Sequence, residues 1–379
     1  MDLSPSPGDE AFRAEARAWL AAHVPRSPLP SLETGEGFAA HRAWEAELAA
    51  DRWSVVSWPA EFGGRECGLA RWLVFEEEYW AAGAPGRVGQ NGVSLLAPTL
   101  FDHGTAGQRS RVLGPMATGE VVWAQAWSEP EAGSDLASLR SRAVRVSGGW
   151  LLEGQKTWSS RAAFADRAFG LFRTDPDPPR PHQGLTYLMF DLRAAGVTVR
   201  PIGRLDGRPA FAEIFLDEVF VPDEDVIGAP GEGWRIAMSA AGNERGLTLR
   251  SPGRYLAAAD RLAALWRERG APESLRGRVA DALIGARAYD LYTRAAASRF
   301  LAGEELGAGS SVNKVFWSEY DLALHETALE LLGGEAEFAD GSWAEGYVFA
   351  LAGPVYAGTN EIQRDIIAER LLGLPKGRR

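Results

Sequence analysis

The hydrophobic and polar positions of the chain follow different periods in different parts of the sequence. In the first third, apolar residues recur at about every third or fourth position, in residues 10–24, 38–53 and 69–82. This period predicts amphipathic helices. The segments SWP at 57–59 and FGG at 62–64 contain helix breakers and are predicted to separate these helices.

The middle third has short runs rich in β-branched and aromatic residues, punctuated by glycine. The runs cover residues 143–146, 150–153, 168–173, 185–191, 197–201 and 212–216. Residues 174–182, TDPDPPRPH, contain too much proline for a helix or an inner strand, and they predict a long exposed loop. Short strands at regular spacing indicate a small barrel or sandwich.

From residue 233 onward the pattern is helical again. The clearest helices are predicted at residues 251–268, 275–301, 312–332 and 359–372. The order of helical, β and helical regions predicts an α+β multidomain protein. We expect an N-terminal α-helical domain over residues 1–120, a middle β-barrel over 121–228 and a C-terminal helical bundle over 229–379. Flat cofactors bind in clefts of the kind that form where such layers meet.

Composition narrows the class of protein. The chain has 379 residues, which exceeds one small domain, and a formal net charge of −11, which argues against nucleic acid and anionic membrane surfaces as partners. No run approaches the roughly 20 apolar residues of a membrane span, and the first residues, MDLSPSPGDE, lack the basic start and apolar run of a signal peptide. With Cys67 as its single cysteine, the chain forms no internal disulfide, and we expect a cytoplasmic protein. The five histidines have no ligand spacing, so we expect no metal site.

Two segments of the middle region carry candidate chemistry. Residues 123–135, WAQAWSEPEAGSD, offer the hydroxyl of Ser128 and a tight Gly-Ser-Asp turn whose backbone N–H groups suit a phosphate, although such turns are often only turns. Residues 153–160, EGQKTWSS, end a predicted strand with an aromatic ring and hydroxyls. Trp158 could stack on a flat ring and Ser160 could bind a ring nitrogen, but a core tryptophan at a strand end explains the pattern equally well.

A third segment lies near the C-terminus. Residues 354–370, PVYAGTNEIQRDIIAER, place Thr359 where it can cap the following helix and Glu361 in the first helical turn, where a negative charge suits the helix dipole. Taken alone, this is a sufficient structural explanation of the segment.

Together, in this order and spacing, the three segments closely resemble the acyl-CoA dehydrogenase family. The resemblance covers nearly the whole chain and implies that family's fold: an N-terminal helical domain, a β barrel and a C-terminal helical bundle. It also implies bound FAD and an acyl-CoA, or a carrier-bound acyl thioester, as substrate. In the implied α,β-desaturation, a carboxylate removes a proton from Cα while a hydride leaves Cβ for flavin N5. An electron-transferring flavoprotein is the implied electron acceptor.

The resemblance assigns cofactor contacts by position. It implies that Ser128 contacts the flavin pyrimidine edge, that Ser134 contacts the pyrophosphate, and that Trp158 and Ser160 lie beside the flavin ring and N5. The full set that it implies is Gln125, Trp127, Ser128, Gly133, Ser134, Trp158, Ser160, Gly333, Gly334, Thr359 and Glu361.

The position of the catalytic base departs from the commonest family pattern. The usual base is a glutamate in a Tyr-Glu-Gly-Thr segment, and here Ala357 stands in its place. Members that resemble isovaleryl- and long-chain-acyl enzymes supply the base from an earlier helix as Glu-Arg, which corresponds here to Glu244 and Arg245. The resemblance therefore implies Glu244 as the base, Arg245 as the residue that orients it, and the backbone N–H of Ala357 as a donor to the thioester carbonyl. A solvated helix carboxylate paired with Arg245 is the alternative.

Two further departures concern the partner chain. Residues 262–283 lack the Arg-x-x-Phe-Gly motif that reaches a neighbouring subunit's FAD in many members, and Glu330 precedes Gly333 and Gly334 where glutamine is common. Both features resemble the actinobacterial sterol side-chain dehydrogenases, which form mixed tetramers. We expect a homo-oligomer or an α2β2 tetramer with a related chain. A non-catalytic or half-site subunit of such a tetramer, and a flavin monooxygenase or oxidase of the same fold, are the alternative functions.

Overall fold

The computed structural model describes residues 6–245, 251–304, 307–337 and 342–376, and for residues 240–245 it describes the backbone alone. Within these ranges, none of the helices is both long enough and apolar enough to cross a membrane.

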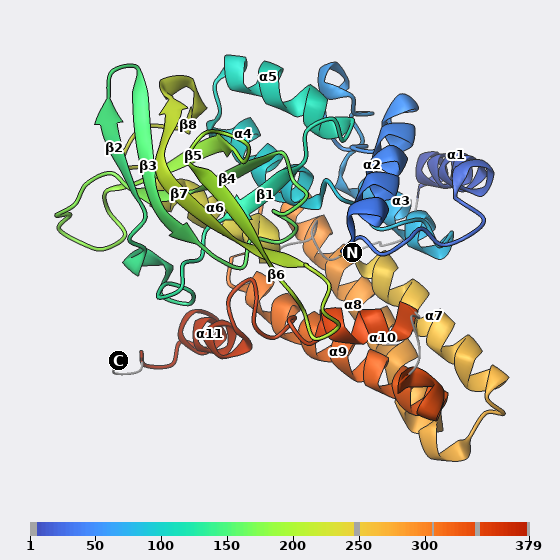
Figure 1. Ribbon diagram of the computed structural model, residues 1–379. Coiled ribbons are helices and arrows are strands. Elements are labelled where there is room, and N and C mark those ends of the chain that lie inside the picture. Colours follow the sequence, from blue (N-terminus) through green and yellow to red (C-terminus); the bar gives the residue numbers. More distant parts are fainter. Residues whose placement is uncertain (1–5, 246–250, 305–306, 338–341, 377–379) are drawn as a thin grey trace. The chain divides into compact units, whose positions relative to one another are not determined.

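The chain divides into two compact units that do not follow its linear order. The helical unit combines Met1–Arg26 and Cys67–Ala84 with Arg245–Arg379. The sheet unit consists of Ser27–Glu66 and Pro85–Glu244. Each unit is described by itself below. The predicted order of N-terminal helices, middle β structure and C-terminal helices is confirmed (Figure 1).

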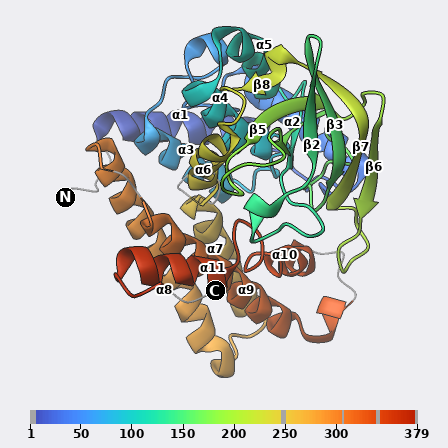
Figure 2. The same cartoon turned by 90° about the vertical axis from the view of Figure 1, so that its left-hand side faces the viewer.

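The sheet unit is built on an eight-stranded sheet. Its strands are β1 (Trp123–Ala126), β2 (Arg142–Val146), β3 (Gly149–Lys156), β4 (Arg167–Arg173), β5 (Leu185–Asp191), β6 (Val197–Ile202), β7 (Phe211–Pro222) and β8 (Val226–Ile227). They run in the order β6-β7-β3-β2-β4-β5-β8, and β1 pairs with β4. Figure 2 shows β2, β3, β7 and β6 following one another to one edge of the sheet.

The burial of each strand explains its sequence pattern. Strand β5, which pairs with β4 and β8, is buried at every position except its last, so it reads as a continuous hydrophobic run. Successive residues of β4 alternate between two core clusters, because Phe169 and Leu171 join one cluster and Ala168 and Phe172 join the other. The edge strand β6 is at most half-buried, and its burial alternates with period two over residues 197–200.

Helices complete both units. Those of the sheet unit are α2 (Gly35–Ala50), α4 (Ala97–His103), α5 (Ala106–Ala117) and α6 (Gly233–Arg245), the last of which ends one residue beyond the unit's boundary. Those of the helical unit are α1 (Pro7–His23), α3 (Leu69–Ala81), α7 (Pro252–Glu268), α8 (Glu273–Leu301), α9 (Gly309–Leu332), α10 (Ser342–Ala350) and α11 (Asn360–Ile366). Buried residues of α7, α8 and α9, among them Tyr255, Tyr289 and Trp317, form the core of the helical unit. The single helix predicted over 359–372 is instead α11 followed by a π-helical turn at Ile367–Leu371.

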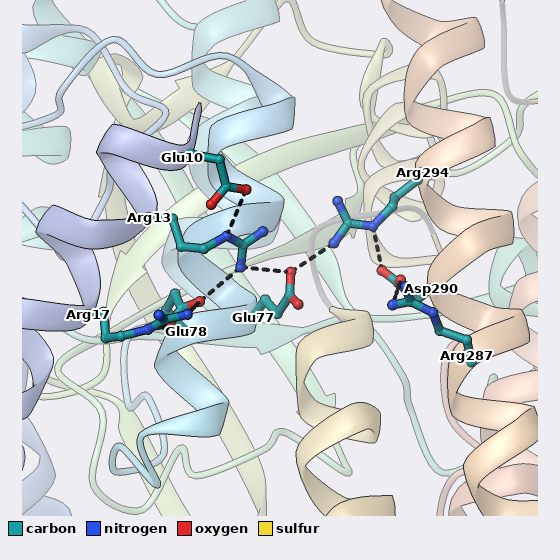
Figure 3. Close-up of polar contacts among 8 residues, drawn as sticks. All are labelled: Glu10, Arg13, Arg17, Glu77, Glu78, Arg287, Asp290 and Arg294. Carbon is teal, nitrogen blue, oxygen red and sulfur yellow. Dashed lines mark hydrogen bonds and ion pairs between the residues drawn. The ribbon is translucent and has the colours of Figure 1, made fainter. Parts of the chain in front are cut away.

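A network of ion pairs joins three helices of the helical unit (Figure 3). It comprises Glu10, Arg13 and Arg17 of α1, Glu77 and Glu78 of α3, and Arg287, Asp290 and Arg294 of α8. The Nη1 atom of Arg13 lies 2.8 Å from Glu78 Oε1 and 3.2 Å from Glu77 Oε2, and Arg294 Nη2 lies 2.8 Å from Glu77 Oε2. Arginines therefore link segments that are far apart in the sequence.

Candidate functional site

The segments that carry Ser128 and Trp158 lie side by side in the sheet unit. The backbone N–H of Thr157 donates to the carbonyl of Ser128 at 2.9 Å. Trp158 adopts a left-handed backbone conformation, with φ of +58°, and its side chain is 60% exposed, with an edge-on contact to Phe211. Its ring therefore lies outside the core of the sheet unit, and the interpretation as a core tryptophan does not apply.

The chain beyond Trp158 is fixed by backbone bonds. Ser159 and Ala212 exchange two N–H···O bonds of 3.0 Å, and the N–H of Arg161 donates to Ala210. The guanidinium of Arg161 also donates to Glu33 Oε1 at 2.8 Å. Since these contacts hold the backbone on both sides of it, Ser160 is presented half-buried at a defined place.

The turn that carries Gly133 and Ser134 is open to solvent. Glu129 and Ala132 exchange two backbone hydrogen bonds of 3.0 Å, which close the turn just before it. Gly133 and Ser134 are exposed, and a Cβ atom placed on Gly133 would meet no heavy atom within 4 Å. The turn thus has free space around its backbone, as an anion-binding turn requires.

Two of the predicted contacts lie on or just after β1. Gln125 is half-buried within β1. Trp127 is only 9% exposed, belongs to the core cluster around Tyr187, and donates from its indole N–H to the Tyr187 hydroxyl at 3.1 Å. The ring of Trp127 therefore serves the core of the sheet unit.

Sequence reasoning did not single out the charged residues between these segments. Lys156 is fully buried, and its Nζ donates to Glu129 Oε1 at 2.8 Å and to the carbonyl of Leu171 at 2.7 Å. Burial lowers the pKa of Lys156 to about 8, although the charge of Glu129 acts in the opposite direction. Burial also acts to raise the pKa of Glu129, but the charge of Lys156 and the N–H of Arg140 outweigh it, so that this pKa is below its ordinary value.

The third candidate segment belongs to the helical unit. Ala357 has a left-handed backbone, with φ of +56°, and its carbonyl accepts from Gln363 Nε2 at 3.1 Å. The prediction that Thr359 caps the following helix is confirmed, because its hydroxyl accepts from the N–H of Ile362 at 3.3 Å. A hydrogen bond from its own backbone N–H and one with Thr359 lower the pKa of Glu361, which is exposed at the start of α11.

A buried lysine also lies beneath this segment. Lys314 of α9 is fully buried, and its Nζ donates to Asn360 Oδ1 at 2.7 Å. The hydroxyl of Ser318 donates to the same oxygen at 3.0 Å, and Asn360 Nδ2 donates to Glu319 at 3.2 Å. Both the oxygen and the nitrogen of the Asn360 side-chain amide are therefore hydrogen-bonded, and this residue directly follows the capping Thr359.

The two glycines after α9 are uncrowded, and the nearby acidic residue is paired. Gly333 directly follows α9 with φ of +57°, and a Cβ atom on it or on Gly334 would meet nothing within 4 Å. Glu330 forms an ion pair with Arg278. The negative charge that replaces the family's common glutamine is therefore compensated within the helical unit.

Glu244 and Arg245 lie at the end of α6, and their side chains lie outside the described residues. Their backbone places them on a helix, as the resemblance implies. The candidate residues fall in both units: those from Gln125 to Ser160, with Glu244, are in the sheet unit, and the remainder are in the helical unit.

The chain's own features fit a flat cofactor that carries a diphosphate. Trp158 is exposed, two positions before the half-buried Ser160 and in a segment whose backbone bonds to the half-buried Ser128, and the Gly133–Ser134 turn is exposed. An aromatic face suits a planar ring system, and open backbone N–H groups suit phosphate oxygens.

Comparison with known proteins identifies the family. Residues 6–120, 124–219 and 231–372 match the N-terminal, middle and C-terminal domains of acyl-CoA dehydrogenases. The acyl-CoA dehydrogenase IpdE1 of Mycobacterium tuberculosis is 37% identical over 382 residues, which cover 97% of this chain and 98% of the relative. Two solved structures each cover all of both chains: the Tcur3481-Tcur3483 steroid ACAD, at a TM-score of 0.87 and 27% identity, and the ChsE4-ChsE5 complex from Mycobacterium tuberculosis, at 0.83 and 28%. The chain therefore belongs to the acyl-CoA dehydrogenase family of FAD-dependent oxidoreductases, and its similarity extends to the actinobacterial sterol-type members.

Proposed function

We propose that this protein oxidises the Cα–Cβ bond of an acyl-CoA thioester to a double bond. The observation that carries the proposal is the conformation of Trp158, whose ring is 60% exposed on a left-handed backbone. A non-glycine residue in that conformation is strained, such strain persists only where the surrounding structure fixes it, and it clusters at functional sites. When bound, FAD supplies the electron-accepting ring for this oxidation.

The proton at Cα requires a base and a stabilised carbonyl. A thioester Cα–H is a weak acid, so donors must be aimed at the oxygen that gains charge. Ala357 has no proton acceptor, and its backbone N–H is the donor that we propose for this oxygen. Glu244 on α6 is the base that we propose, since it has a carboxylate at the place implied by the family's Glu-Arg pattern. Arg245 follows it directly and is proposed to orient its carboxylate.

We further propose a bulky, steroid-derived acyl chain as the preferred substrate. The support is the similarity to a protein named as a steroid ACAD, which the chain matches over its full length. It is strengthened by Ala357, because a base on α6 leaves the 356–359 segment with a small residue where many members carry a glutamate.

The proposal is tested by mixing the FAD-loaded protein anaerobically with a panel of straight, branched and steroid-derived acyl-CoAs. Bleaching of the flavin by the steroid-derived members, with product shown by mass spectrometry to have lost two hydrogens, is the expected result. If none of the thioesters bleaches the flavin, either for the chain alone or with a co-expressed related chain, the proposed activity is wrong. Rapid oxygen consumption with an external reductant would then favour the monooxygenase or oxidase alternative.

An oligomer is the second part of the proposal. The long helix α8 exposes large apolar side chains, including Ile284 at 66%, Phe300 at 53% and Leu301 at 60%. Apolar exposure of this kind marks interaction surfaces. Since both structural neighbours named above carry paired names, we propose a mixed assembly with a related chain as an alternative to a homo-oligomer. The mass in solution, measured for the chain alone and after co-expression with the related chain, distinguishes them, and a monomer that binds FAD tightly would contradict both.

A further inference from the structure

Glu129 and Lys156 form a buried ion pair where two segments with candidate cofactor contacts meet. Glu129 directly follows Ser128, and Lys156 ends β3 two positions before Trp158. Their exposed fractions are 7% and 0%. The proposed reaction uses neither charge directly, so the pair requires a separate explanation.

The surroundings of Lys156 match an ammonium group. Its three N–H donors meet three acceptors: Glu129 Oε1 at 2.8 Å, the carbonyl of Leu171 at 2.7 Å and, more weakly, the carbonyl of Trp127 at 3.4 Å. Acceptors spread around one point suit a compact ammonium better than a planar guanidinium. The chain has lysine at only two other positions, 314 and 376, and otherwise uses arginine for positive charge.

The carboxylate of Glu129 binds a further segment of the chain. Its Oε2 accepts from the N–H of Arg140 at 2.6 Å, and its Oε1 accepts from the N–H of Ser141 at 2.9 Å. One carboxylate therefore fixes the turn after Ser128, the start of β2 and the end of β3. The bond between Thr157 N–H and the Ser128 carbonyl then sets the distance between the two candidate segments.

Stability alone is a poor explanation for such a pair. Removing two charges from water is costly, and replacing a buried ion pair with apolar residues of similar volume is often neutral or stabilising. A pair that reaches three segments by hydrogen bonds does, however, fix their relative positions more tightly than apolar packing does.

We propose that Glu129 and Lys156 are positioning residues for the flavin ring. They hold the Ser128 hydroxyl and the Trp158 ring in fixed relation, so that both contact the ring at the same time. The inference rests on the proposed function, since it takes Ser128 and Trp158 as contacts of the flavin ring.

The test uses the FAD-loaded protein and two readouts of its resting state. Lys156→Met removes the charge and keeps the length of the side chain, and Glu129→Gln removes the charge and keeps one of the two oxygens that accept from the Arg140 and Ser141 N–H groups. An indole stacked on a flavin quenches its fluorescence. We therefore expect brighter emission from bound flavin in both variants, with FAD binding weakened roughly 2–10-fold, the loss expected from a misaligned stack. If Lys156→Met does not fold, Glu129→Gln alone tests the proposal.

Leu188→Ala is the matched control for a general loss of stability. Leu188 is fully buried in β5, and its side chain has no polar group. It should lower the melting temperature and leave the flavin emission and FAD affinity as in the unaltered protein. The proposal is overturned if Lys156→Met and Glu129→Gln leave both readouts unchanged, or if Leu188→Ala changes them to the same extent. Because neither readout requires turnover, a protein whose flavin no acyl-CoA bleaches would contradict the proposed function and leave this test intact.

Discussion

Two clusters of charged residues, one in each unit, link separate segments of the chain in different ways. In the helical unit, the network of Figure 3 shares most of its carboxylates between two arginines: Glu77 contacts Arg13 and Arg294, and Asp290 contacts Arg287 and Arg294. In the sheet unit, Lys156 pairs with one carboxylate and is fully buried, whereas Arg287 is 62% exposed.

The number of cations that pair with a carboxylate determines how each cluster responds to a substitution. In the shared network, loss of one arginine leaves Glu77, Glu78 and Asp290 each with another arginine, and water reaches part of the site. In the buried pair, loss of Lys156 leaves the charge of Glu129 without its ion-pair partner, although the N–H groups of Arg140 and Ser141 still donate to it. We therefore expect the network to keep linking its helices after loss of one arginine. In the buried pair, a single substitution should change the relative positions of the linked segments.

The largest loss of stability should follow from removing the buried lysine. Lys156→Met strands a buried carboxylate, and removal of one partner of a buried pair lowers the free energy of unfolding by about 3–5 kcal/mol. Urea unfolding measures it. The double variant Lys156→Met with Glu129→Gln should recover part of the loss because no buried charge remains. A double variant no more stable than Lys156→Met would show that the charge of Glu129 is not the cause.

A smaller loss should follow in the shared network. Arg294→Met leaves Asp290 with Arg287 and Glu77 with Arg13, so we expect a decrease of about 1–3 kcal/mol, the usual worth of hydrogen bonds to charged groups. The same urea titration measures it. A loss equal to that of Lys156→Met would remove the distinction between shared and single partners.

The stability that the two clusters contribute should change in different pH ranges, which are alkaline for Lys156 and acidic for Glu78. The pKa of Lys156 is about 8 in the folded protein against 10.5 ordinarily, so the unfolded chain binds more protons between these values. The stability of the unaltered protein relative to Lys156→Met should thus rise from pH 8 to pH 10.5. Burial acts to raise the pKa of Glu78, but hydrogen bonds from Arg17 and Arg13 hold it below 4.5. The stability that Glu78 contributes is present above pH 4.5 and is lost as pH falls through the lowered pKa. The difference in free energy of unfolding between the unaltered protein and Glu78→Gln should therefore shrink as pH falls below 4.5.

Among the described residues, few charges act on the pair, which simplifies the alkaline measurement. Glu129 acts directly on Lys156, and Arg173 at the end of β4 interacts with Glu129. Chemical unfolding at several pH values gives both curves. A stability difference from Lys156→Met that does not change between pH 8 and 10.5 would contradict the lowered pKa of Lys156.

The smallest loss of stability should follow from removing an exposed ion pair on the sheet. Arg142 of β2 pairs with Glu153 of β3 at exposed fractions of 60% and 30%. Arg142→Gln should change the free energy of unfolding by about 0–1 kcal/mol, because water screens the pair. Thermal unfolding at low and high salt checks it, and a loss comparable to that of Arg294→Met would mean that exposure does not rank these interactions.

Much of the fold was predictable because the hydrophobic pattern within each segment indicates its secondary structure. The strand runs of the middle region and the helices at 69–81, 252–268 and 273–301 agree with the structure within a few residues. Helices α4 and α5 were missed, since Pro98, Gly104 and Pro115 interrupt the apolar period around them. The strand β1 was missed because it has four residues and is recognisable only through its pairing with β4.

The site was predictable where a residue's own segment shows its chemistry. Thr359 caps a helix that begins at the next residue, and the hydroxyls of Ser128 and Ser160 stand in recognisable segments. The pair of Glu129 and Lys156 was not predicted, because 27 positions separate the two residues and only the sheet brings them together. The roles of the predicted cofactor contacts stay predictions, as does Glu244, whose side chain lies outside the described residues.

The most direct test of the central claim compares Glu244→Gln with the unaltered protein in anaerobic rapid mixing with a steroid-derived acyl-CoA. The substitution keeps the shape of the side chain and removes the proton acceptor. We predict flavin reduction slower by roughly 10²–10⁴-fold, the usual worth of a general base, at unchanged FAD content. Adding Ala357→Glu to Glu244→Gln should recover part of the rate. Reduction of the Glu244→Gln flavin as fast as that of the unaltered protein would contradict the assignment of the base.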